Sequence, residues 1–229
     1  MANAITVGRI GLLFVVLWVM YGQNPAVVQW CGPAIALVIL ADALDGWVAR
    51  RRHETSQFGA IFDIVGDRIV ELACWIVFAH MGLIPVWVPL LVVARAFIVD
   101  GLRSSSYSDG MTPFGGKNIM RSKLSQWLTA GRFMRGLFGF AKLAAFVLLA
   151  IDRAYQLPGG PATLLGQLWG FGWFRVVTWV LVWAAVALTV IRAVPVIIDS
   201  IAYLHEKDVK ERSGEILDST ETVAPSSGN

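Results

Sequence analysis

Six apolar stretches of about 20 residues each constrain the fold of this chain more than any other feature. A helix of that length can cross the ~30 Å hydrocarbon core of a bilayer. With 56% hydrophobic residues and a mean hydropathy of +0.63, the chain is too apolar for an ordinary soluble domain. We therefore predict an all-α integral membrane protein whose six transmembrane helices cover residues 5–22, 27–49, 60–82, 84–104, 124–152 and 174–204.

The composition divides the chain into two parts. Residues 1–205 contain all six stretches and are predicted to form one membrane domain, whereas residues 206–229 are charged and then rich in Ser and Thr, which predicts a disordered cytoplasmic tail. The first stretch carries Arg9 and lacks a basic leader followed by a small-residue cleavage site. We therefore expect a retained helix and not a signal peptide.

Basic residues gather in alternate connections between the stretches. The connections after the second and fourth stretches and the tail hold most of the Lys and Arg, while the other three connections contain only Arg153. Cytoplasmic loops collect such residues, so both termini are predicted to face the cytoplasm of a plasma or inner membrane. The formal charge of +3 and the pI of about 9.1 indicate contact with anionic lipid headgroups and not with nucleic acid.

Four aspartates lie on either side of the basic connection that follows the second stretch. They require a positively charged partner, because a charge at membrane depth costs at least about 2.5 to 3.5 kcal/mol. Side chains three and four residues apart share one face of a helix, which sorts these acids and their neighbours into two stripes. The first stripe consists of Asp42, Asp45, Gly46, Ala49 and Arg50, and the second of Gly59, Asp63 and Asp67.

Facing stripes would concentrate oxygen ligands of the kind that suit Mg²⁺, Mn²⁺ or Ca²⁺ better than Zn²⁺. No Cys or His lies on either stripe. The alternative is that the acids cap helix ends or pair with Arg50, Arg51, Arg52 and Arg68. Four aligned acids would then need four partners aimed the same way, so we favour a divalent-metal site.

The spacing D-x2-D-G-x2-A-R-x8-G-x3-D-x3-D, from Asp42 to Asp67, resembles the signature of the CDP-alcohol phosphotransferases, and all eight of its fixed positions are met. Within that family, the opening Asn3-x2-Thr6-x2-Arg9 and the later Ala94-Arg95-x7-Arg103 look like phosphatidylglycerophosphate synthases. The stretch from Met111 to Asn118 departs from that pattern.

The resemblance implies transfer of a phosphoryl-linked group from a CDP-alcohol, most often CDP-diacylglycerol, to an acceptor hydroxyl with release of CMP. By resemblance, two divalent ions, Mg²⁺ or Mn²⁺, would be held by Asp42, Asp45, Asp63 and Asp67. Asp67 would be the general base or, since a metal-bound carboxylate is a weak base, would mainly orient the hydroxyl. The donor nucleotide and diphosphate would contact Gly46, Ala49, Arg50 and Gly59.

The acceptor is inferred from other basic residues at membrane depth, which need an anion or a wet cavity. A phosphate on the acceptor would satisfy Lys123, Arg132, Arg135 and Arg192, so glycerol 3-phosphate is favoured, ahead of inositol phosphate, serine and other uncharged alcohols. Snorkelling to lipid headgroups is the alternative, most of all for Lys123. Arg95 is predicted to form a buried ion pair with Glu71, which continues the second stripe by one turn.

Two other interpretations compete with this enzyme. The acids could form the site of a divalent-cation transporter, although that leaves Gly46, Arg50 and Gly59 unexplained and such transporters usually show repeats. A catalytically dead scaffold is disfavoured because no motif position is altered. A homodimer is expected only by analogy with similar proteins.

Overall fold

The computed structural model describes residues 2–52, 57–108, 127–128 and 131–221, and these contain helices and turns but no strand. The chain divides into two compact units that are treated separately below. Unit 1 comprises Met1–Ala94 and Gly136–Thr189, and unit 2 comprises Arg95–Arg135 and Val190–Asn229. The predicted all-α class is confirmed for the described residues.

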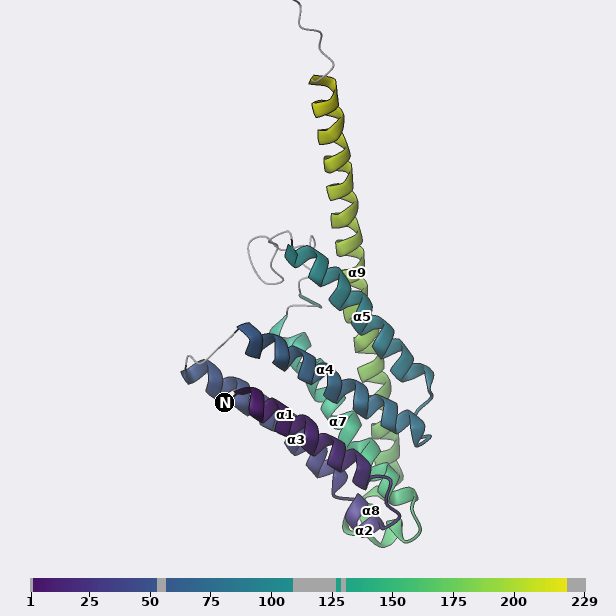
Figure 1. The fold of residues 1–229 in the computed structure, drawn as a ribbon. Coiled ribbons are helices and arrows are strands. Elements are labelled where there is room, and N and C mark those ends of the chain that lie inside the picture. The colour runs from purple at the N-terminus through teal and green to yellow at the C-terminus, as the bar shows by residue number, and fades with distance from the viewer. Residues whose placement is uncertain (1, 53–56, 109–126, 129–130, 222–229) are drawn as a thin grey trace, which may run out of the picture. The chain divides into compact units, whose positions relative to one another are not determined.

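A long helix overlaps each of the six predicted apolar stretches (Figure 1). The long helices are α1 (Ala2–Val19), α3 (Cys31–Arg52), α4 (Gln57–His80), α5 (Trp87–Ser108), α7 (Arg132–Gln156) and α9 (Gly172–Glu221). Short helices α2 (Pro25–Val28) and α8 (Leu164–Trp169) and the 3₁₀ turn η1 (Gly160–Ala162) lie in the connections.

Local sequence explains where several of these elements begin and end. The Asn24 side chain accepts a hydrogen bond from the Ala26 N–H at 3.0 Å and Pro25 follows it, which starts α2. The Thr163 hydroxyl caps α8 in the same way by accepting from the Gly166 N–H. After α4 the chain turns at Gly82, whose φ of 73° is the left-handed conformation that favours glycine.

Helix α9 differs from the predicted disordered tail, because it continues without interruption through residues 206–221. Two opposite-charge pairs four residues apart, Glu206 with Lys210 and Asp208 with Arg212, suit a helix surface. No proline interrupts the chain between Pro195 and Pro225. The charged composition predicts disorder, whereas the spacing of the charges favours a helix; residues 222–229 lie outside the described residues.

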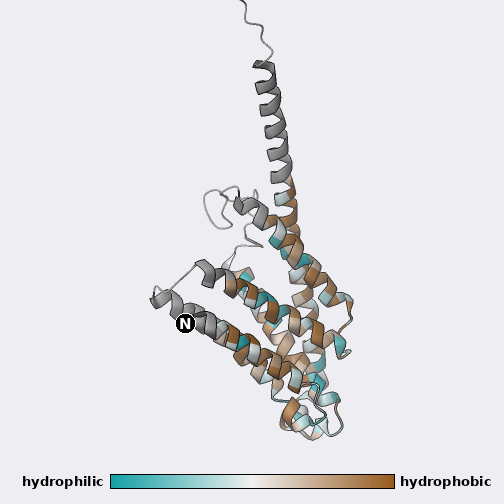
Figure 2. Cartoon of the chain, in the orientation of Figure 1, coloured by the Kyte–Doolittle hydropathy of each residue, from teal (hydrophilic) through white to brown (hydrophobic). Residues whose placement is uncertain are grey.

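Two helical segments among the described residues are long and apolar enough to cross a membrane, Phe133–Gln156 and Gly172–Ala202. Shorter apolar helices cover Thr6–Val19 and Pro25–Ala41. Figure 2 shows apolar residues distributed along the helices. The number of six membrane crossings and the cytoplasmic termini stay predictions.

Side chains from six helices build the core of unit 1, and its largest members are aromatic. Trp75 and Phe146 are fully buried and meet edge to face, with ring centroids 4.9 Å apart. Helix α1 packs against both α3 and α4, as Figure 1 shows. The two helices that carry the aspartates are thus both held by the N-terminal helix. In unit 2 a small apolar cluster contains Val99, Ala193 and Val196.

Candidate functional site

The two predicted stripes lie on two helices that follow each other in the chain. Asp42 and Asp45 belong to the second half of α3, and Asp63 and Asp67 to the first half of α4. Because both segments are helical, the spacing argument for two single-face stripes holds. Only residues 53–56 separate the helices, and these lie outside the described residues.

Side chains can be described for only part of the acidic motif. Those of Asp42, Asp45, Gly46, Ala49, Arg50 and Asp63 lie outside the described residues, although their positions within α3 and α4 are given. Gly59, in the first turn of α4, is half-buried. The convergence of all four carboxylates therefore stays a prediction, and Asp67 is the acid whose surroundings can be examined.

Asp67 presents a largely open carboxylate to its surroundings. Its side chain is 56% exposed, and its Oδ1 accepts a hydrogen bond from Nη2 of Arg9 at 3.3 Å. Arg9 belongs to α1, and its side chain is only 6% exposed. A buried guanidinium thus meets an exposed carboxylate. Sequence reasoning did not assign Arg9 to the site, although an arginine in the middle of an apolar helix is a signal that such a partner exists.

Close packing of α1 on α4 brings Arg9 to this position. Gly66 faces α1, and a Cβ added there would lie 2.8 Å from Cγ2 of Thr6 and 3.2 Å from Nη2 of Arg9. The first distance is shorter than any ordinary contact, and the β-branched Thr6 has little freedom to move away. A glycine beside Asp67 therefore permits the approach of the two helices.

One turn further along α4, Glu71 forms a second ion-pair cluster. Its Oε2 lies 3.2 Å from Nζ of Lys142 on α7 and 3.5 Å from Nη1 of Arg68. Its side chain is 5% exposed. Within unit 1 the carboxylate thus meets Lys142 and Arg68, while Arg95 belongs to unit 2, so the Glu71–Arg95 pair stays a prediction. Helix spacing could have suggested Arg68, three residues away, but the partner on α7 depends on tertiary packing that the sequence does not reveal.

Two buried polar atoms accompany this cluster without a hydrogen-bond partner among the described residues, Oε1 of Glu71 and Nε1 of Trp75. One is an acceptor and the other a donor, and they belong to residues four apart on α4. Lys142 also lies over the ring of Phe138, with its Nζ 5.2 Å from the ring centroid. Glu71 and its partners thus form a polar patch within the apolar core of unit 1.

The predicted acceptor residues are only partly described. Lys123 lies outside the described residues, and Arg132 is the first residue of α7 with its side chain not described. Arg135 is exposed on α7, and Arg192 is half-buried on α9. Arg135 and Arg192 belong to unit 2 and Asp67 to unit 1, and each unit is described by itself. Their shared role stays a prediction.

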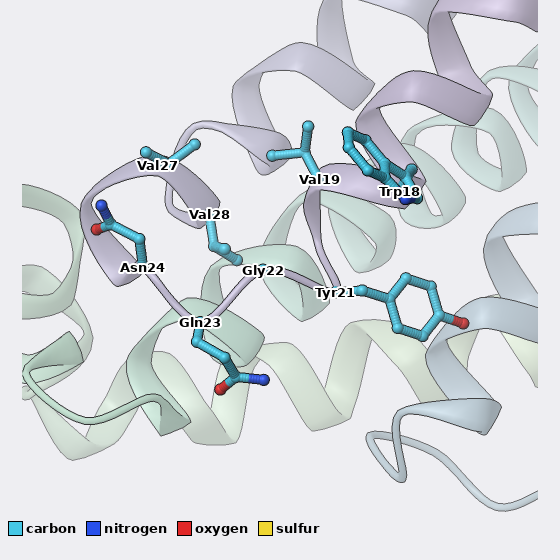
Figure 3. Close-up of a pocket in the computed structure, with 8 residues that line it drawn as sticks. All are labelled: Trp18, Val19, Tyr21, Gly22, Gln23, Asn24, Val27 and Val28. Carbon is cyan, nitrogen blue, oxygen red and sulfur yellow. The ribbon is translucent and has the colours of Figure 1, made fainter.

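A pocket of about 400 Å³ lies at the C-terminal end of α1 (Figure 3). Trp18, Tyr21, Gln23 and Asn24 contribute to its lining. Trp18 is nine residues beyond Arg9, about 14 Å along the helix axis at 1.5 Å per residue. The pocket is therefore separate from the acidic site, and Asn24 already uses its side-chain oxygen to cap α2.

Comparison with known proteins gives a consistent result. A family model described as CDP-alcohol phosphatidyltransferase matches residues 1–191. The chain is 28% identical over 113 residues to the CDP-diacylglycerol–glycerol-3-phosphate 3-phosphatidyltransferase of Bacillus subtilis, an alignment that covers 44% of this chain and 58% of that protein. The matched region thus spans less than two thirds of that relative's length.

Two further relatives align over more of the chain. A protein of Mycobacterium tuberculosis named "Probable phosphatidylglycerophosphate synthase" is 29% identical over 157 residues, covering 66% of this chain and 73% of that protein. A cardiolipin synthase (CMP-forming) of Streptomyces coelicolor is 25% identical over 196 residues, covering 82% of this chain and 80% of that protein. The first name gives glycerol 3-phosphate as the acceptor, the second gives phosphatidylglycerophosphate as the product, and the third gives cardiolipin as the product and CMP as a by-product.

Proposed function

Because the chain belongs to the CDP-alcohol phosphatidyltransferase family, we propose that it transfers a phosphatidyl group from CDP-diacylglycerol, or a similar CDP-alcohol, to an acceptor hydroxyl and releases CMP in phospholipid biosynthesis. The observation that carries the proposal is the match over residues 1–191, which includes all eight motif positions. The alternative of a divalent-cation transporter gains no support from the relatives.

The proposed reaction exchanges one phosphorus–oxygen bond for another. The acceptor oxygen attacks the phosphorus that carries the lipid alcohol, and the diphosphate bond to CMP breaks, with CMP taking the electron pair. Asp67 accepts the hydroxyl proton or orients the hydroxyl for attack. Its exposed carboxylate supports this role, because an acceptor can approach it.

The residues on the two stripes fit hard divalent cations. Carboxylate oxygens are the ligands that Mg²⁺ and Mn²⁺ prefer, and the open carboxylate of Asp67 is accessible to an ion. Asp42, Asp45, Asp63 and Asp67 would hold two ions. When bound, such ions would neutralise the diphosphate and polarise the phosphorus. Asp63→Asn should abolish CMP release without unfolding the protein, and more than a few per cent residual activity at saturating Mg²⁺ would contradict this role.

Donor binding is assigned to the small and basic residues of the motif. Gly46, Ala49 and Gly59 leave room for the nucleotide to lie against α3 and α4. Arg50 would donate charge-assisted hydrogen bonds to the diphosphate. These positions lie on the same helix faces as the acids, which supports one continuous donor and metal site.

The favoured acceptor is glycerol 3-phosphate, with inositol phosphate or serine as alternatives. Two relatives are named for phosphatidylglycerophosphate synthesis or for glycerol 3-phosphate itself. Lys123, Arg132, Arg135 and Arg192 would bind the acceptor phosphate. Replacing Arg132, Arg135 or Arg192 by Gln should lower the acceptor kcat/KM about 10- to 150-fold, the effect of one charge-assisted hydrogen bond, with the donor KM nearly unchanged. If kcat/KM fell equally for the donor and the acceptor, these arginines would instead have structural or headgroup-anchoring roles.

The reaction itself is tested directly. Purified protein is incubated with CDP-diacylglycerol, Mg²⁺ or Mn²⁺ and separate labelled acceptors, namely glycerol 3-phosphate, inositol phosphate and serine. Release of CMP together with a labelled lipid identifies the acceptor. If no acceptor yields CMP while the protein remains folded, the proposed activity is wrong.

We place this enzyme in the plasma or inner membrane, with six crossings, both termini and the acidic site at the cytoplasmic side. Large apolar side chains exposed on its helices, such as Trp18, Phe97 and Phe133, support contact with lipid. With the free, buried Cys31 and Cys74 replaced, a cysteine at position 55 should be labelled by impermeant reagents from the cytoplasm only, and one at position 159 from the opposite side only. The reverse pattern would overturn this orientation.

A further inference from the structure

Arg9 is a buried cation that the proposed reaction has not yet used. Its side chain is almost fully enclosed by the helices of unit 1, and a buried guanidinium requires a compensating anion. The contact with Oδ1 of Asp67 supplies one, yet the Asp67 side chain remains 56% exposed. A pair that served packing alone would bury both partners. Here the buried Arg9 holds the exposed carboxylate of Asp67.

The helix contact that sets this distance is also specific. Gly66 directly precedes Asp67 on α4 and faces Thr6 and Arg9 of α1. Any larger residue would push the two helices apart at the turn that carries the carboxylate. By contrast, a Cβ at Gly11, also on α1, would meet nothing within 4 Å. The tight contact at Gly66 thus lies beside the ion pair, whereas Gly11 faces open space.

We propose that Arg9 is a positioning residue for Asp67. Gly66 allows α1 and α4 to lie close enough for Arg9 to reach the Asp67 carboxylate. With one carboxylate oxygen held by Arg9, rotation of the Asp67 carboxylate is restricted, so its lone pairs keep one direction toward the acceptor hydroxyl. A misaligned base loses catalytic efficiency without losing substrate binding. The inference rests on the proposed function, because it assigns Asp67 to the acceptor hydroxyl.

The kinetic test uses four variants, Arg9→Gln, Arg9→Lys, Gly66→Ala and Gly11→Ala. Arg9→Gln should lower kcat about 10- to 150-fold, as expected for loss of one charge-assisted hydrogen bond, while the donor KM changes less than about threefold. Arg9→Lys keeps a positive charge and should give an intermediate kcat. Gly66→Ala should lower kcat, whereas Gly11→Ala, with the same gain in helix propensity, should not.

A second readout does not depend on activity. Thermal unfolding in detergent is measured for Arg9→Gln, Asp67→Asn and the double variant, without substrate or metal. If the pair exists, the Tm decrease of the double variant is smaller than the sum of the single decreases. Additive decreases, or an Arg9→Gln enzyme with kcat within about twofold of wild type, would overturn the inference. A wild-type protein that releases no CMP, with a coupled Tm cycle, would instead reject the proposed function and keep the ion pair.

Discussion

Asp67 and Glu71 lie one turn apart on α4 and each meets a cation from another helix, yet their surroundings are opposite. The Asp67 carboxylate is 56% exposed and its partner Arg9 is 6% exposed. The Glu71 carboxylate is 5% exposed and its partner Lys142 is 22% exposed. In the first pair the acid remains open to a ligand, and in the second it is enclosed by protein. Exposure of the acid, more than the presence of a partner, therefore separates the candidate catalytic acid from a structural one.

The difference follows from the position of each acid along α4, because residues four apart share one face of the helix. Glu71 lies among the buried residues Cys74, Trp75 and Phe146, where an ionised carboxylate is tolerated only with cations beside it. Asp67 lies one turn nearer the start of α4 and is the last residue of the predicted acidic motif. The same helix thus carries the candidate catalytic acid and a structural acid, four residues apart.

The largest expected effect separates the two acids by activity. Asp67→Asn should lower kcat by about 10²- to 10⁴-fold, the usual contribution of a general base, together with the Tm decrease that follows when the buried Arg9 loses this partner. Glu71→Gln should lower Tm and leave the kcat of the folded enzyme within about threefold of wild type. CMP release and thermal unfolding are measured on the same preparations. Comparable kcat losses in both variants would contradict the distinction between the two acids and would place Glu71 in the active site.

A second prediction tests the structural role of Glu71 by charge removal. Glu71→Met leaves Lys142 without its buried anion and should destabilise the protein by about 3 kcal/mol, the lower end of the usual range because Lys142 is partly exposed. Adding Lys142→Met removes both charges and should recover most of that loss. Thermal or denaturant unfolding in detergent measures both. A double variant as unstable as Glu71→Met would show that the cluster depends on more than this pair.

Helix positions and the acidic motif could be predicted from the sequence because both depend on local spacing. The six apolar stretches overlap the six long helices, and Asp63 and Asp67 share α4 as expected. Partners across helices could not be predicted. Arg9 reaches Asp67 through the packing at Gly66, and Glu71 meets Lys142, 71 residues away in the chain. The apolar pattern shows which residues are helical but not which helix faces which.

The smallest expected effect concerns the aromatic ring beside Lys142. Phe138 lies beneath the ammonium group, with Nζ 5.2 Å from the ring centroid, in the range of a cation–π contact. Phe138→Leu keeps an apolar side chain but removes the ring, so it should cost about 0.5 to 1 kcal/mol in the presence of Lys142. In the Glu71→Met/Lys142→Met background the same substitution should cost less, since no cation remains over the ring. Unfolding measured for these variants gives the coupling, and an equal cost in both backgrounds would assign the ring to packing alone, leaving the Lys142 charge stabilised by Glu71 without help from Phe138.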